Sequence, residues 1–222
     1  MDAPRSGAGR NRQLPGGRGR QWLYYAAAVS SWGTSQEAIG VATSPSSLPG
    51  TWTDHGKVFA SETTDTWNAI DPALIQADGR LWMSFGSYWT GIRMVELNPR
   101  TGKALEKAPV HHLATRPDAP YAVEGPYIVK HGRHYYLFAS YDACCAGVNS
   151  TYKIRVGRST SVTGPYADSE GKPMLEGGET CFWQATAGTS ARAASRCSGR
   201  RARTGWPVTT TTRRTRARPS WA

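Results

Sequence analysis

The sequence of 222 residues has no long apolar run and no sustained helical periodicity. Its apolar stretches fall well short of the roughly 18 residues that a membrane-spanning helix needs, so no membrane partner is predicted. Residues 1–21 also lack the apolar segment of a signal peptide, and none is predicted in this chain.

Cysteine and histidine are scarce and fit no metal-binding pattern. His131 and His134 flank a Gly-Arg turn instead of sharing a helical face, and Cys181 and Cys197 have no zinc-site spacing. We therefore expect no metal site and no cofactor in this chain.

Cys144 and Cys145 are adjacent in the sequence. A vicinal disulfide is feasible in a loop of a secreted protein, and free thiols in such a loop are the alternative. The sequence leaves both states open.

The acidic residues are missing from the end of the chain, which explains its formal net charge of +11. Residues 181–222 carry nine Arg and no acid, and residues 1–21 carry five Arg and one Asp. Residues 22–180 carry thirteen Lys and Arg against fifteen Asp and Glu, a net charge of −2. The basic charge thus belongs to the tails, which argues against nucleic-acid binding by the body.

The two tails show neither strand nor helix periodicity, and we expect both to be disordered. Residues 1–21 are rich in Gly and Arg, whereas residues 181–222 form a low-complexity sequence composed mainly of Arg, Thr, Ala and Ser. The abrupt change near Thr180 is typical of out-of-frame translation of a GC-rich gene. An RNA-binding or targeting tail is the alternative.

Between residues 22 and 180 the sequence consists of short alternating strands that repeat. An aromatic strand after a Gly-Arg turn occurs three times, with Trp22, Trp82 and Tyr135 at equivalent places, 60 and 53 residues apart. Strand-only repeats of this length are typical of a β-propeller with one four-stranded blade per repeat. We predict an all-β fold with about three blades, the first without its opening strand; a β-sandwich is the alternative.

Two acidic residues occupy the same place in successive repeats, just before the aromatic strand. They are Asp71 in Asn68-Ala-Ile-Asp-Pro and Glu124 in Val123-Glu-Gly-Pro. The first strand of each blade lines the axis of a propeller, so the two carboxylates are expected to converge there. Paired carboxylates in an aromatic-edged pocket are what glycoside hydrolysis requires. Turn acids that cap strand ends are the alternative.

At these residues the chain resembles the endo-acting arabinanases of glycoside hydrolase family 43, which are five-bladed β-propellers. The resemblance spans residues 22–180 and rests on four segments in the right order: Trp67-Asn-Ala-Ile-Asp-Pro, Trp82-Met-Ser-Phe-Gly-Ser-Tyr-Trp-Thr-Gly-Ile, Glu124-Gly-Pro-Tyr-Ile and Cys144-Cys-Ala-Gly-Val-Asn-Ser-Thr-Tyr-Lys-Ile. It implies a secreted, monomeric hydrolase that cleaves α-1,5-L-arabinofuranosidic bonds of arabinan by inversion.

The resemblance also implies roles for individual residues. Glu124 matches the general acid, and Asp71 matches the carboxylate that raises the pKa of that acid. Trp89 would offer an apolar face to a furanose ring, with a core position as the alternative. The residues implied in sugar binding are Gly33, Asn68, Ala69, Ile70, Asp71, Ser87, Tyr88 and Trp89.

Two features of the family have no match in this sequence. The general base, an Asp of the first blade, matches nothing here, and neither does the His-bearing Gly-Pro-Gly-His segment associated with a central calcium ion. A fragment with impaired or lost activity is therefore expected. Other functions left open are an exo-acting arabinofuranosidase, a β-xylosidase and a non-catalytic carbohydrate-binding propeller.

Overall fold

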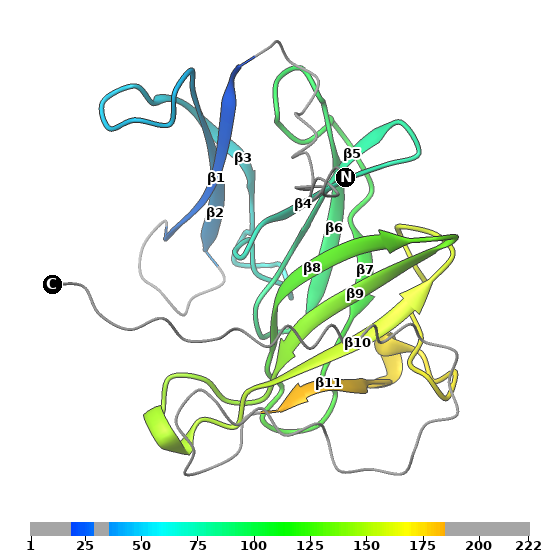
Figure 1. Ribbon diagram of the computed structural model, residues 1–222. Coiled ribbons are helices and arrows are strands. Elements are labelled where there is room, and N and C mark those ends of the chain that lie inside the picture. Colours follow the sequence, from blue (N-terminus) through cyan, green and yellow to red (C-terminus); the bar gives the residue numbers. More distant parts are fainter. Residues whose placement is uncertain (1–18, 29–35, 185–222) are drawn as a thin grey trace, which may run out of the picture.

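The computed structural model describes residues 19–28 and 36–184, which form three antiparallel β-sheets (Figure 1). The first sheet holds β1 (Gln21–Ala28), β2 (Glu37–Ser44) and β3 (Thr53–Ala60). The second holds β4 (Ala73–Ala77), β5 (Arg80–Phe85), β6 (Ile92–Leu97) and β7 (His111–Ala114). The third holds β8 (Val123–His131), β9 (His134–Tyr141), β10 (Lys153–Ser159) and β11 (Thr180–Gln184).

Helical structure in the described ranges is limited to two single turns, η1 (Gly147–Asn149) and η2 (Met174–Glu176). None of the described residues belongs to a helix that is long and apolar enough to cross a membrane. The structure thus confirms the all-β prediction.

Each sheet corresponds to one of the predicted repeats. The three aromatic strands that the repeat aligned are β1, β5 and β9, and each pairs with the next strand along the chain. In the second and third sheets a further strand, β4 or β8, precedes the aromatic strand and pairs with it. Within the described residues the first sheet has no such strand, as the sequence predicts.

The strands extend slightly beyond the predicted body of residues 22–180. β1 begins at Gln21, and β11 continues to Gln184. β11 pairs with β10, where Arg155 lies opposite Cys181, so backbone hydrogen bonding carries the strand past the change in composition. Residues 1–18 and 185–222 of the two predicted tails lie outside the described residues.

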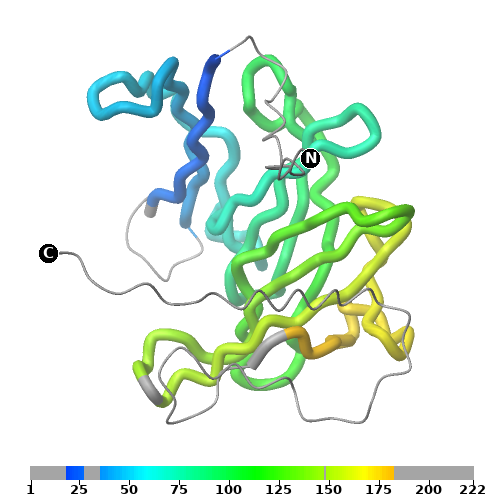
Figure 2. Tube along the Cα trace, in the orientation of Figure 1, coloured from blue at the N-terminus to red at the C-terminus, as the bar shows by residue number. Residues whose placement is uncertain are grey.

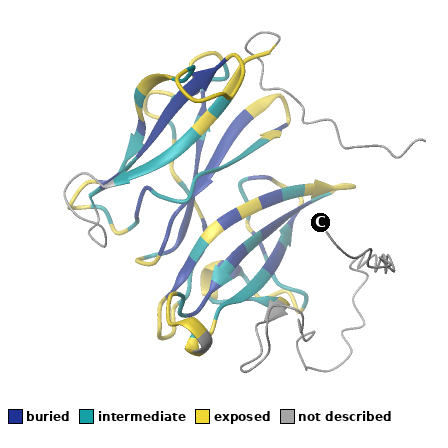
Figure 3. Cartoon of the chain, turned by 60° about the vertical axis from the view of Figure 1, so that its left-hand side comes forward, coloured by how far each residue is buried: buried dark blue, intermediate teal, exposed yellow. Residues whose placement is uncertain are grey.

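Two buried clusters join the sheets, and the second sheet lies between the other two (Figure 2). Ile39 and Val41 of β2 pack with Phe85 of β5 in one cluster. In the other, Trp82 of β5 packs with Tyr135 of β9. Buried positions lie mainly within the sheets, and most exposed positions lie in the connections between strands (Figure 3).

Gly91, just before β6, provides a test of how tightly the second sheet is closed. Its φ is +94°, and an added Cβ would overlap the carbonyl oxygen of Ala114 in β7. Gly79 has a similar φ of +78° with no atom within 4 Å of such a Cβ. Gly79→Ala should therefore cost only the conformational strain of about 1–2 kcal/mol in the free energy of unfolding.

We expect Gly91→Ala to cost at least about 2 kcal/mol more, because the strand pair must also move apart. Chemical denaturation of the two variants and the parent measures both values. Equal destabilisation by the two substitutions would contradict the close approach of Gly91 to β7.

Candidate active site

Asp71 and Glu124 lie next to each other at the start of neighbouring inner strands. Asp71 precedes β4 by two residues, and Glu124 is the second residue of β8. The backbone N–H of Gly125 donates a hydrogen bond to Asp71 Oδ2 at 3.1 Å. The convergence that the repeat predicts is thus present.

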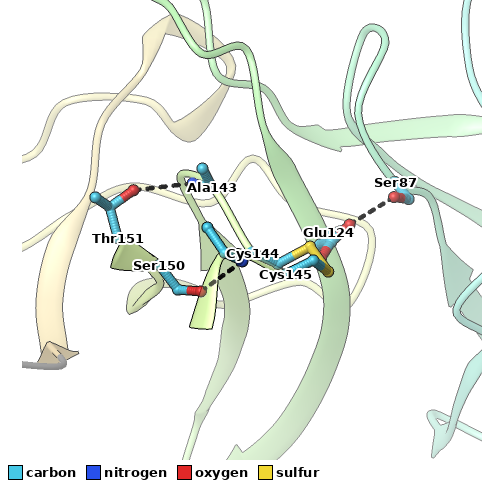
Figure 4. The surroundings of a disulfide bond; sticks show 8 residues. Ser87, Glu124, Ala143, Cys144, Cys145, Ser150 and Thr151 are labelled. Atoms are coloured by element: carbon cyan, nitrogen blue, oxygen red, sulfur yellow. Dashed lines mark hydrogen bonds between the residues drawn. A yellow bond between two sulfur atoms is a disulfide. The ribbon is translucent and has the colours of Figure 1, made fainter. Parts of the chain in front are cut away.

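Glu124 is held by the connection between β5 and β6. The Ser87 hydroxyl donates to Glu124 Oε2 at 2.7 Å, as Figure 4 shows. The backbone N–H of Tyr88 donates to the Val123 carbonyl at 3.0 Å. These bonds attach the Ser87–Trp89 segment to the strand that carries Glu124.

An aromatic cluster of the partly buried Phe59 and Trp67 and the buried Phe85 positions the segment that leads to Asp71. Trp67 stacks on Phe59 at 5.3 Å and meets Phe85 edge-on at 5.6 Å. The N–H of Gly86 donates to the Ile70 carbonyl at 2.8 Å, so this segment is tied to the end of β5. Asp71 itself has a φ of +56°, a backbone conformation that the surrounding contacts must enforce.

These segments border a cavity of about 860 Å³. Its lining comes mainly from connections between strands in all three sheets and includes the side chains of Glu37, Asn68, Ile70, Ser87, Tyr88, Trp89, Pro120, Tyr121, Glu124, Cys144 and Cys145. The volume is that of a small-molecule or saccharide site.

Most of the predicted sugar-binding residues meet at this cavity. Ala69 and Asp71 are not among its lining residues. Ala69 is fully buried, with its N–H donating to the Ser61 hydroxyl. Trp89 is 48% exposed and lines the cavity, so the alternative of a core position is wrong. Gly33 lies outside the described residues.

The cavity also includes residues that the sequence did not single out for binding. Glu37 at the start of β2 is a second carboxylate in the lining, beside Glu124, and Pro120 and Tyr121 come from the β7–β8 connection. Tyr121 is 57% exposed. It lies three residues before Glu124 in the sequence, and an aromatic residue so close to the predicted acid was the signal that could have identified it as a binding residue. Cys144 and Cys145 are joined in a disulfide, one of the two states that the sequence left open.

Both carboxyl groups have pKa values above their ordinary range. For Glu124 the main cause is burial, and the nearby Asp71 charge adds to it, while the hydrogen bond from Ser87 acts in the opposite direction. Burial also raises the pKa of Asp71, opposed by the hydrogen bond from Gly125. A carboxyl group with a raised pKa beside a second carboxylate is the combination that favours protonation of a leaving group.

No set of three or more His, Cys, Asp or Glu side chains among the described residues is arranged to hold a metal ion. No step of the chemistry below involves a metal ion.

Comparison with known proteins places the fold and site in context. Residues 13–193 match the model of the family described as glycosyl hydrolases family 43. The extracellular endo-α-(1→5)-L-arabinanase 1 of Bacillus subtilis (strain 168) is 47% identical over 163 residues, 73% of this chain and 49% of that protein. The extracellular exo-α-(1→5)-L-arabinofuranosidase ArbA of Cellvibrio japonicus (strain Ueda107) is 42% identical over 72% of this chain and 50% of its own length.

Among solved structures, the Cellvibrio cellulosa α-L-arabinanase complexed with arabinohexaose aligns with a TM-score of 0.70 at 38% identity. The alignment covers 77% of this chain and 58% of that one. The chain thus spans about half the length of the curated relatives that it matches.

Proposed function

The chain belongs to glycosyl hydrolases family 43, and on that premise we propose that it serves the inverting hydrolysis of α-1,5-L-arabinofuranosidic bonds in arabinan. The observation that carries the proposal is the pair formed by Asp71 and Glu124. Glu124 lines the cavity, and the N–H of the next residue, Gly125, donates a hydrogen bond to Asp71. The names of the relatives support arabinan as the substrate.

In this proposal Glu124 is the general acid. Its Oε2 accepts the Ser87 hydroxyl, so Oε1 is the oxygen left to carry the proton to the leaving glycosidic oxygen. Burial raises the pKa of Glu124, which favours the protonated form that a general acid needs. Proton donation in the transition state accounts for about 10²–10⁴-fold in rate.

Asp71 acts on Glu124 through its charge and through Gly125. An ionised Asp71 raises the pKa of Glu124, since two neighbouring carboxylates do not ionise easily together. Its hydrogen bond from Gly125 also fixes the backbone beside the acid. Inversion further requires a base that activates water, and we assign that role to none of the described residues.

The aromatic rim of the cavity suits a furanose chain. Tyr88 and Trp89 are 38% and 48% exposed and lie directly after Ser87, which holds the acid. Apolar ring faces can contact sugar C–H groups, while Asn68 at the cavity offers a polar amide.

Hydrolysis of linear arabinan tests this proposal. Because the chain spans about half of its relatives, the assay uses a chimera that joins residues 19–184 to the flanking segments of the Bacillus subtilis relative. We expect reducing ends to appear, and proton NMR should first detect the β-anomer, since inversion of an α-linkage gives that product. An initial α-anomer would reject inversion, and intact arabinan would reject the proposed function.

Trp89→Ala should weaken the binding of arabinohexaose by about tenfold, because one stacked ring contact is lost. The stability should change little, since Trp89 is half exposed. Isothermal titration calorimetry and a thermal melt measure the two effects. Trp22→Ala, at a partly buried aromatic outside this cavity, is the control for binding and should leave the affinity unchanged.

An exo-acting arabinofuranosidase is the second candidate, favoured by the 42% identical Cellvibrio relative of that name. Viscometry separates the two: an endo-acting enzyme lowers the viscosity of arabinan early, whereas an exo-acting enzyme releases small sugars first. We further propose an extracellular location, in keeping with the names of both curated relatives, and action as a monomer on polysaccharide with no nucleic-acid or membrane partner.

A further inference from the structure

The disulfide between Cys144 and Cys145 lies in the connection between β9 and β10, at the same end of the third sheet as Glu124. In the register of that sheet, Glu124 of β8 pairs with Ser140 of β9, two residues before the connection begins. The N–H of Asp142 donates to the Ala122 carbonyl at 3.1 Å, next to the start of β8. The strand pairing therefore directs this connection toward the acid.

Both cysteines line the cavity that holds Glu124, Ser87 and Trp89. Cys144 is partly buried, and Cys145 is exposed. Figure 4 shows the S–S bond with Glu124 and its hydrogen bond to Ser87 in the same view. The sulfur atoms are thus accessible within the site and are not part of the core.

The connection is held at its base by buried charges. Asp142 has a side chain only 8% exposed, with Oδ1 at 3.0 Å from the Arg116 guanidinium and Oδ2 at 2.5 Å from Lys153 Nζ. Two cations on one buried carboxylate fix the point at which the chain leaves β9.

Hydrogen bonds close the connection above that base. The Ala143 N–H donates to Thr151 Oγ1 at 3.1 Å, and the Thr151 N–H donates to the Ala143 carbonyl at 2.9 Å. The Ala146 N–H donates to the Ser150 hydroxyl at 3.0 Å. The two sulfurs are therefore presented from a braced loop.

Left-handed backbone at non-glycine residues is frequent around the cavity. Of the nine non-glycine residues with positive φ in the described ranges, four line the cavity: Tyr88, Trp89, Tyr121 and Cys145. Such conformations cost energy and persist only where the surrounding structure enforces them, and they often cluster at ligand sites. Cys145 thus shares this property with three aromatic residues of the rim.

The geometry points to the Cys144–Cys145 disulfide as a sugar-contacting surface of the cleft, packing against the apolar face of an arabinofuranose residue. A disulfide has no S–H to donate and is a weak acceptor, so it suits C–H groups better than hydroxyls. Its sulfurs are large and polarisable, which favours close dispersion contact. This inference rests on the proposed function, since arabinan is the ligand.

The test measures the affinity of the full chain and its variants for arabinohexaose by isothermal titration calorimetry. We expect Cys144→Ser/Cys145→Ser to bind about tenfold more weakly than the parent, because the apolar sulfur surface becomes two hydroxyls. A second pair, Cys144→Ala/Cys145→Ala, should be weakened too, because it removes the sulfur surface without adding hydroxyls. Iodoacetamide should leave Cys144 and Cys145 unlabelled in the parent.

Thr151→Val is the matched control, since it removes the hydroxyl that braces Ala143 but keeps both sulfurs. We expect its affinity to stay within about twofold of the parent. A loss as large as that of the serine pair would show that loop position alone matters and would overturn the inference. Thermal melts identify any variant that is not folded. If one of the two cysteine double variants is unfolded, the affinity of the other double variant decides the outcome.

The outcomes separate this inference from the proposed function. If the parent binds arabinohexaose and both cysteine pairs bind equally well, the disulfide is no contact surface, and the proposed function stands. If the parent does not bind arabinohexaose at all, the inference fails, whereas the proposed function is decided separately by arabinan hydrolysis in the chimera.

Discussion

Glu124→Gln should lower the rate of arabinan hydrolysis by about 10²–10⁴-fold in the chimera described above. Glutamine has nearly the same shape and can still accept the Ser87 hydroxyl, but it cannot transfer a proton to the leaving oxygen. An aryl arabinofuranoside with a good leaving group needs little protonation, so its hydrolysis should fall much less. Reducing-end and chromogenic assays measure the two rates.

Glu62→Gln is the matched control, because Glu62 is exposed and lies outside the cavity. It should leave both rates unchanged. A Glu124→Gln enzyme with near-parental activity on arabinan would show that another group supplies the proton, and the proposed mechanism would then be wrong.

Asp71→Asn should shift the alkaline limb of the pH–rate profile to lower pH. Burial and the Asp71 charge both raise the pKa of Glu124, and the substitution removes the second cause. The active form is the protonated acid, so a lower pKa means that activity is lost earlier as the pH rises. Well above that pKa, the protonated fraction falls about tenfold for each pH unit.

The geometry should survive this change, since the amide oxygen of the introduced asparagine can still accept the Gly125 N–H. Activity at the acidic end should therefore be closer to that of the parent than activity at the alkaline end. Asp78→Asn is the control, because Asp78 also has a positive φ, of +50°, but lies in an exposed turn. An unshifted alkaline limb for Asp71→Asn would separate Asp71 from the ionisation of Glu124.

The repeats predicted the blades because strand periodicity and turn chemistry are local. Trp22, Trp82 and Tyr135 lie near the starts of equivalent strands, and among the described residues the first sheet has no strand before β1, as the repeat predicts. The sequence did not predict the end of β11. The strand extends to Gln184 because it pairs with β10, and its own composition does not indicate a strand there. Pairing of this kind cannot be seen within a single segment.

The carboxylate pair could be predicted, since Asp71 and Glu124 hold equivalent positions in successive repeats. Glu37 could not, because it belongs to the first sheet and reaches the cavity only through the packing of the sheets. The burial of individual residues in the Asn68–Asp71 segment could not be predicted either. Whether Ala69 faces the cavity or the core depends on how Trp67 packs against Phe59.

The origin of the cavity residues has a consequence for redesign. Ile70, Trp89, Tyr121 and Cys145 all come from connections between strands, whereas the buried clusters come mainly from the strands. Loops in such positions tolerate exchange better than packed strands do. Substrate preference should therefore be transferable between relatives by grafting the β5–β6, β7–β8 and β9–β10 connections, while the sheets are left as they are.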